Sequence, residues 1–160
     1  MPVIRIRRIQ DDDRVWVAGL LEEHWLSTKI VSRGLVYQAD QLPGFIAEVG
    51  GKPAGLLTYR IDGRQCEVIS MNSLREGIGV GAALLGAARE VARDAGCRRV
   101  WLITTNDNLA ALRYYQKRGF RLAGIHCNAI ETSRELKPEI PLVGRDGIPL
   151  RDEIEFEVGL

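Results

Sequence analysis

Three glycines at alternate positions, Gly77, Gly79 and Gly81, are the residues whose type and spacing most directly suggest chemistry. Glycine permits positive φ angles and leaves backbone N–H groups uncovered by side chains. A run rich in alanine and leucine follows, so these N–H groups are expected at a helix start, where the helix dipole attracts anions such as phosphate. The stretch therefore predicts a phosphate-binding loop, with a plain turn between a strand and a helix as the alternative.

Two common phosphate-binding motifs do not fit this stretch. The dinucleotide fingerprint G-x-G-x-x-G would start at Gly79, but Leu84 stands where its third glycine belongs. The mononucleotide P-loop needs Gly-Lys-Ser or Gly-Lys-Thr, and neither tripeptide occurs in the chain. A nucleotide-binding protein is therefore disfavoured, and another phosphate-containing ligand is expected.

Composition narrows the class of protein. The 160 residues suffice for one domain (residues 1–160) with one core, and the net charge of +1 gives no electrostatic reason to expect a nucleic-acid or membrane partner. No signal peptide is recognised, and the three widely spaced cysteines favour reduced thiols and a cytoplasmic location. Cys66 and Cys127 are expected to be buried apolar residues. Two histidines without a Cys-x-x-Cys pair give no reason to expect a metal.

The elements before the glycines form an antiparallel series. Residues 3–9 alternate as a strand, and an apolar helical face follows the capping candidates at 11–13. The segment 32–40 is ambiguous between a short helix and a loop. Three further strands are expected at 45–49, 54–61 and 66–71. A Gly-Gly-Lys-Pro turn joins the first two of them.

The elements after the glycines form a crossover. A helix is expected from Val80 to a stop at Gly96, followed by the continuous apolar strand 100–103, parallel to the strand before the loop. A second helix is expected at 109–118 and a strand at 120–125. The segment 128–151 contains several prolines and glycines, and a closing strand is expected at 154–158. Long irregular segments like 128–151 are usually lids or disordered linkers.

This element order, with two motifs, resembles the GNAT acetyltransferase superfamily, most closely over residues 71–120. The family's acyl-CoA loop, Q/R-x-x-G-x-G/A, is matched by Gly79 and Gly81, although Glu76 occupies the Gln or Arg position and Arg75 stands one residue earlier. The family's N-x-x-A-x-x-x-Y-x-x-x-G-F signature is matched by Asn108, Ala111, Tyr115, Gly119 and Phe120. The resemblance implies a mixed α/β fold, with a mostly antiparallel central sheet, a β-α-β crossover and flanking helices.

The resemblance also implies acetyl-CoA as the acyl donor and no metal. The pantetheine arm is expected along the end of the third strand of the series, and the pyrophosphate on the loop amides. The implied cofactor-binding residues are Met71, Ser73, Arg75, Gly77, Ile78, Gly79, Val80, Gly81, Ala82, Asn108 and Tyr115.

In the family, an acetyl group is transferred directly to an amine, so one residue must accept a proton and another must protonate the thiolate. Tyr115 matches the family's general acid, with a core tyrosine as the alternative; Tyr114 lies about 100° around the helix. Glu67 is the candidate base, and by the two-residue period it shares a strand face with Ile69 and Met71. An edge-exposed glutamate is the alternative; Gln65 occupies the family's more frequent base position.

The acceptor is an unidentified primary amine of a small molecule or protein. The resemblance places it between residues 25–37 and 128–151. In the second segment Glu131, Glu135, Glu139 and Asp146 are candidates to meet a cationic amine, with a solvated charged loop as the alternative. The expected activity is N-acetyl transfer within a ternary complex, and the alternative is a non-catalytic acyl-CoA-binding or regulatory module with the same fold. A homodimer is a weak expectation from the family.

Overall fold

The computed structural model describes residues 2–160, in which a seven-stranded sheet, a two-stranded sheet and four α-helices are formed. In chain order the elements are β1 (Ile4–Arg8), η1 (Asp11–Asp13), α1 (Arg14–Trp25), β2 (Lys29–Ser32), β3 (Leu35–Gln38), η2 (Ala39–Gln41), β4 (Gly44–Val49), β5 (Lys52–Asp62), β6 (Gln65–Ser73), α2 (Val80–Asp94), β7 (Arg99–Thr105), α3 (Leu109–Lys117), β8 (Arg121–His126), α4 (Ala129–Leu136), η3 (Arg145–Gly147) and β9 (Glu153–Gly159).

The strands of the large sheet lie in the order β1-β4-β5-β6-β7-β9-β8. Neighbouring strands are antiparallel except β6 and β7, which are parallel and are connected through α2. This arrangement confirms the expected fold class and the crossover. The last strand, β9, lies between β7 and β8, so residues far apart in the sequence meet at this end of the sheet.

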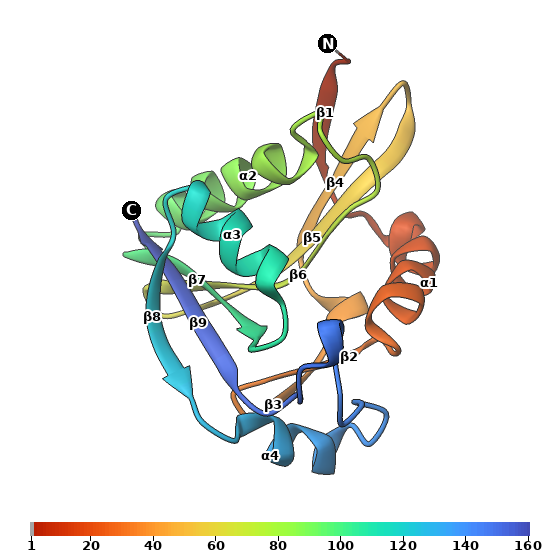
Figure 1. The fold of residues 1–160 in the computed structure, drawn as a ribbon. Coiled ribbons are helices and arrows are strands. Elements are labelled where there is room, and N and C mark those ends of the chain that lie inside the picture. Colours follow the sequence, from red (N-terminus) through yellow and green to blue (C-terminus); the bar gives the residue numbers. More distant parts are fainter. Residues whose placement is uncertain (1) are drawn as a thin grey trace.

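Helices cover both faces of the sheet (Figure 1). On one face, α2 and α3 pack on a core that includes the fully buried side chains of Leu57, Val100 and Phe156. On the other face, α1 packs through Val17 and Leu21 against apolar residues of β4, β5 and β6. The long strands β5 and β6 supply apolar side chains to both cores, because successive residues of a strand point to opposite faces.

The ambiguous segment 32–40 is neither a helix nor a plain loop. It belongs to a hairpin in which β2 pairs antiparallel with β3. The two turn residues, Arg33 and Gly34, both have positive φ (50° and 75°), which is the geometry that matches the twist of a two-residue hairpin.

The segment 128–151 is also more ordered than a linker. It contains α4, η3 and a bridge between Val143 and Pro149. The Arg134 guanidinium fastens it by donating to the backbone oxygens of Ile140, Pro141 and Leu150, at 3.2, 2.9 and 2.7 Å. Within residues 2–160, no helix has the length and apolar character needed to cross a membrane.

Candidate active site

The centre of the sheet opens where β6 and β7 separate. These strands pair only from Gln65 to Val68 on β6. Beyond that point β7 continues against β9, while residues 70–73 of β6 pair with β5 alone. A cleft of about 780 Å³ lies at this opening, lined by residues of β6, β7, α1, α3, the β2 strand and the segment 128–151.

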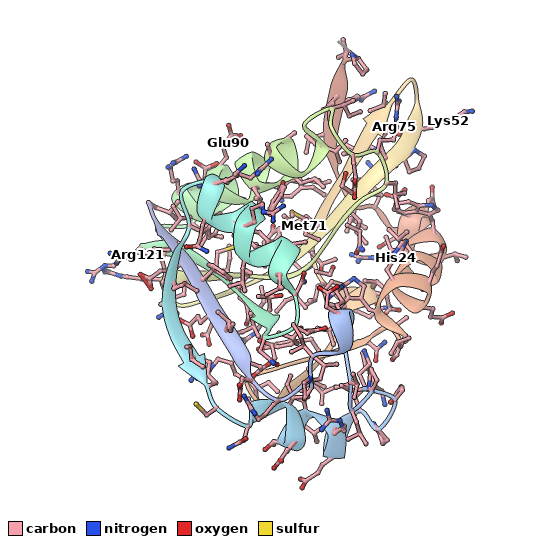
Figure 2. All side chains as sticks on the ribbon, viewed as in Figure 1. His24, Lys52, Met71, Arg75, Glu90 and Arg121 are labelled. Atoms are coloured by element: carbon pink, nitrogen blue, oxygen red, sulfur yellow. The ribbon has the colours of Figure 1, made fainter. Side chains whose placement is uncertain are left out.

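A β-bulge in β6 changes which side chains share a face. Thr58 of β5 pairs with Ser70 and the next residue pairs with Val68, so Ile69 is an extra residue in β6. Glu67 and Ile69 lie on the α1 side, but Met71 packs with the core beneath α2 and α3. Figure 2 shows Met71 close to α3. The expectation that Glu67 and Met71 share a face is therefore wrong.

The glycine loop leads into the N-terminus of α2 as expected. Gly77 and Gly79 have φ angles of 79° and 93°, in the region that favours glycine. The Ala83 amide donates to the Gly79 carbonyl at 3.0 Å as the first helical hydrogen bond. The amides of the three residues before it, Val80, Gly81 and Ala82, therefore have no helical acceptor and can bind an anion.

The third glycine has a packing function. A Cβ atom on Gly81 would lie 2.1 Å from the Tyr114 hydroxyl oxygen, so glycine is what allows α3 to approach α2 here. The charged side chains of the loop, in contrast, are exposed to solvent. Arg75 and Glu76 are both exposed, and Ser73 Oγ donates to the Arg75 carbonyl at 3.1 Å. The Glu76 carboxylate is therefore free to stay in solvent while backbone amides face an anion.

Asn108 begins α3 at the wall of the cleft. Its side-chain oxygen accepts a hydrogen bond from the Ala111 amide at 3.2 Å, and its side-chain nitrogen donates to Thr104 Oγ1 at 3.2 Å. These two bonds fix the end of β7 against the start of α3. Asn108 thus positions the helix that carries Tyr114 and Tyr115.

The two neighbouring tyrosines of α3 point in different directions, as their helical spacing predicts. Tyr114 packs over Gly81, whereas Tyr115 lines the cleft. The Tyr115 ring packs against Phe120 and Phe156, with centroids 5.5 and 5.8 Å away. Its hydroxyl has no hydrogen-bond partner among residues 2–160. Burial raises the pKa of Tyr115, so it remains a neutral proton donor at neutral pH.

Glu67 lines the same cleft. Its side chain is buried because β6 is a central strand between β5 and β7, so the alternative of an edge-exposed glutamate is excluded. Ser32 Oγ donates to Glu67 Oε2 at 2.6 Å. Burial raises the pKa of the Glu67 carboxyl, and the Ser32 hydrogen bond opposes part of that rise. A carboxylate in this environment is a better proton acceptor than one in water.

The cleft brings together some of the predicted site residues and not others. Glu67, Met71, Asn108 and Tyr115 line it. The other predicted cofactor-binding residues lie outside it, in the loop and first turn of α2 that follow β6: Ser73, Arg75, Gly77, Ile78, Gly79, Val80, Gly81 and Ala82. One extended ligand running along β6 would contact both groups.

The expected acceptor segments do line the cleft, but their acidic residues do not. Trp25, Ser32 and Lys137 are among the lining residues, whereas the four predicted acidic residues of 128–151 are not: Glu131, Glu135, Glu139 and Asp146. The carboxylates that line the cleft besides Glu67 are Asp107 and Glu153, and sequence reasoning missed both. Glu153 opens a strand of alternating acidic and apolar residues, a pattern that suggested exposure.

None of the three cysteines is among the residues that line the cleft. The three cysteines are free; Cys66 and Cys97 are buried, and burial raises the pKa of the Cys66 thiol to about 12. Cys127 is exposed, so its expected burial is wrong. In the part of the chain that the structure describes, no three histidine, cysteine or carboxylate side chains are grouped as metal ligands.

Comparisons with known proteins agree on one family. The model of the acetyltransferase (GNAT) family matches residues 6–120. The uncharacterized protein YdhI of Bacillus subtilis (strain 168) is 46% identical over 135 residues, which cover 84% of each chain.

Solved structures share the fold at lower identity. An IAA acetyltransferase from Bacillus cereus has a TM-score of 0.70 and 23% identity, covering 99% of this chain and 100% of the other. A GNAT family acetyltransferase from Elizabethkingia anophelis, solved with acetyl-CoA bound, has a TM-score of 0.69 and 18% identity, covering 98% of both chains.

Proposed function

This chain belongs to the GNAT acetyltransferase family, and we propose that it transfers an acetyl group from acetyl-CoA directly to a primary amine in a ternary complex. One observation carries the proposal. A single cleft is lined both by a buried carboxylate, Glu67, and by Tyr115, whose hydroxyl has no hydrogen-bond partner in the described residues 2–160. A proton acceptor and a proton donor therefore face the same space.

The residues along β6 and α2 fit an acyl-CoA donor. Where β6 leaves β7, residues 69–73 have a free backbone edge, which can pair with the amide groups of a pantetheine arm. The unpaired amides at the start of α2 follow directly and suit a pyrophosphate. Acetyl-CoA supplies an acetyl group already activated as a thioester, so the protein has mainly to align the amine and move two protons.

The lone pair of the neutral acceptor amine forms the C–N bond at the acetyl carbonyl carbon. Glu67 accepts the proton that the nitrogen releases as this bond forms, directly or through a water molecule, and later returns it to solvent. The C–S bond then breaks. Tyr115 donates its hydroxyl proton to the leaving sulfur and regains a proton from solvent. The raised pKa of Glu67 suits its task, since the carboxylate gains basicity, and Tyr115 is protonated at neutral pH and so has a proton to give.

The test is thiol release from acetyl-CoA in the presence of a panel of amines. We expect Tyr115→Phe to lower kcat by about 100-fold or more with unchanged CoA affinity in calorimetric titration. Tyr114→Phe is the matched control, because Tyr114 lies next to it in α3 but does not line the cleft. We expect the rate of the wild type to fall as the pH drops through the raised pKa of Glu67, and Glu67→Gln to remove this dependence.

Two outcomes would overturn the proposal. A folded protein that binds no acetyl-CoA would contradict the assignment of β6 and α2. Tight CoA binding without thiol release for any amine would instead indicate the non-catalytic acyl-CoA-binding module, to which the unusual carboxylate of Glu76 in the loop also points.

A further inference from the structure

The first strand of the β2–β3 hairpin lines the cleft near Glu67. The hairpin is fastened to the floor of the cleft at two neighbouring residues. Ser32 Oγ donates to Glu67 Oε2 at 2.6 Å, and the Arg33 amide donates to Glu153 Oε1 at 3.2 Å. Glu67 belongs to β6 and Glu153 to β9, so these two bonds connect the hairpin to strands on both sides of β7.

Lys137, the residue directly after α4, connects the segments on another side of the cleft. The buried Lys137 ammonium donates to the Trp25 carbonyl at 2.6 Å and to the Lys29 carbonyl at 2.8 Å. It thereby joins α4 to the end of α1 and the start of β2. These bonds hold the segments that line this end of the cleft in fixed positions relative to one another.

Two carboxylates face this space with little compensation. Glu67 is 4% exposed and Glu153 is 1% exposed, and both line the cleft. Glu67 Oε1 accepts no hydrogen bond from residues 2–160, and Glu153 accepts one only from the Arg33 amide in that part of the chain. Buried carboxylates are normally paired with a cation, because removing the charge from water is unfavourable.

The basic side chains near Glu153 contact another carboxylate, that of Glu155. Glu155, two residues along β9, lies 2.7 Å from Arg99 Nη1, 3.1 Å from His126 Nε2 and 3.5 Å from Arg33 Nη1. Burial raises the pKa of Glu153, and this rise is opposed only in part by the Arg33 amide and by the more distant His126 and Arg33 side chains, neither of which forms an ion pair with Glu153 in residues 2–160. Glu155 is therefore neutralised by close partners, and Glu153 is not.

The basic side chains Lys137 and Arg145, which line the cleft, already contact other protein groups. Lys137 is held by two carbonyls, and Arg145 lies 3.9 Å from Asp107. Arg60, which acts on Glu67 from a distance, pairs with Asp62 at 3.5 Å. His24 lines the cleft from α1 (Figure 2). The negative charge of this end therefore has no close positive partner within the described chain.

We propose that the acceptor is a small diamine or polyamine, with the nitrogen to be acetylated beside Glu67 and a second, positively charged nitrogen beside Glu153. The inference rests on the proposed transfer reaction and names its substrate class. The first nitrogen forms the C–N bond and releases its proton to Glu67, and the C–S bond of the thioester then breaks. The second nitrogen keeps its proton and its charge throughout, so Glu153 positions the acceptor without taking part in proton transfer.

The test compares acceptors of equal length that differ in one end group. Thiol release is measured with 1,4-diaminobutane, 1-aminobutane and 4-aminobutanoate. We expect kcat/KM to be about 10-fold or more higher for the diamine than for the monoamine, from one added charge-assisted hydrogen bond. We expect the aminocarboxylate to be the poorest acceptor. Equal values for diamine and monoamine on the wild-type protein would overturn the inference without any variant.

Variants on one strand then assign the effect. Glu153→Gln retains an oxygen for the Arg33 amide but loses the charge, and we expect the ratio of diamine to monoamine kcat/KM to fall close to one. Glu157→Gln is the matched control. Glu157 is on the same strand, pairs with Arg99 and Arg121, and does not line the cleft. An unchanged ratio in Glu153→Gln, or an equal fall in both variants, would contradict the inference.

A binding measurement separates this inference from the proposed function. 1,4-Diaminobutane is titrated calorimetrically into the protein saturated with CoA. Diamine binding that is weakened about 10-fold in Glu153→Gln supports the inference even when no amine gives thiol release, an outcome that would refute only the transfer reaction. Thiol release with monoamines or peptides at undiminished efficiency supports the transfer reaction and refutes the diamine acceptor.

Discussion

Replacement of Gly81 by alanine tests the contact between α2 and α3 on which the position of Tyr115 depends. A Cβ at this position would lie 2.1 Å from Tyr114 Oη and 3.1 Å from Cζ. Ordinary carbon–oxygen contacts are about 3.4 Å or longer, so Tyr114 would have to move by about 1.3 Å. Overpacking of this kind costs about 1–3 kcal/mol, while alanine gains up to about 1 kcal/mol in helix propensity.

We therefore expect Gly81→Ala to lower the free energy of unfolding by about 1–2 kcal/mol, measured by urea denaturation. Because the displaced ring belongs to the residue next to Tyr115, thiol release should fall as well. Gly86→Ala is the matched control: Gly86 lies in the same helix, and an added Cβ there meets nothing within 4 Å. This control should stabilise the protein, by up to about 1 kcal/mol.

The double variant Gly81→Ala/Tyr114→Phe makes the test specific to one atom. Removing the hydroxyl leaves only the 3.1 Å approach to Cζ, so most of the lost stability should return. A coupling free energy of about 1 kcal/mol is expected from the double-mutant cycle. Equal stabilities of Gly81→Ala and Gly86→Ala, or a cycle without coupling, would refute the packing argument.

Three further outcomes follow from other contacts. Asn108→Ala should lower the free energy of unfolding by about 1 kcal/mol through loss of the α3 cap, whereas Asn108→Asp should retain most of it in the same urea assay. Lys137→Met should destabilise the protein by about 1–3 kcal/mol by leaving two carbonyls without their charged donor, while Lys52→Met at the exposed first residue of β5 should change little. Burial raises the folded-state pKa of Glu67 above its ordinary value of 4.5, so its contribution to stability is complete below that pH and is lost as the pH rises through the folded-state pKa. Glu67→Gln should therefore be more stable than the wild type at pH 8 and nearly equal to it at pH 4; the reverse order at pH 8 would contradict the burial argument.

The fold was predictable because its central elements have strong local patterns. The continuous apolar run 100–103 marks a strand covered on both faces, and the alanine- and leucine-rich run ending at Gly96 marks a helix. Together they define the crossover that distinguishes this sheet from a simple meander. A motif singled out Asn108 and Tyr115, and its spacing reflects a helix that begins with a cap and brings Tyr115 to the cleft about two turns later.

The acceptor side was not predictable, for identifiable reasons. The β2–β3 hairpin turns at Arg33 and Gly34, and arginine is an unusual residue at a position of positive φ, so the usual Asn-Gly signal is missing. The bulge at Ile69 breaks the two-residue period, which moved Met71 to the other face. Glu153 lies in a strand whose alternation suggests one solvated face, whereas its insertion between β7 and β8 buries the acidic residue.

The position of β9 also constrains how the protein is made. In residues 2–160, strand β8 pairs with β9 and with no other strand, so during synthesis it cannot join the sheet until β9 has been made. Until then the backbone edge of β7 that β9 covers stays unpaired, and an unpaired strand edge can pair wrongly with another chain. The same late step brings Glu153 to the cleft. Completion of the sheet and completion of the cleft lining are thus one event.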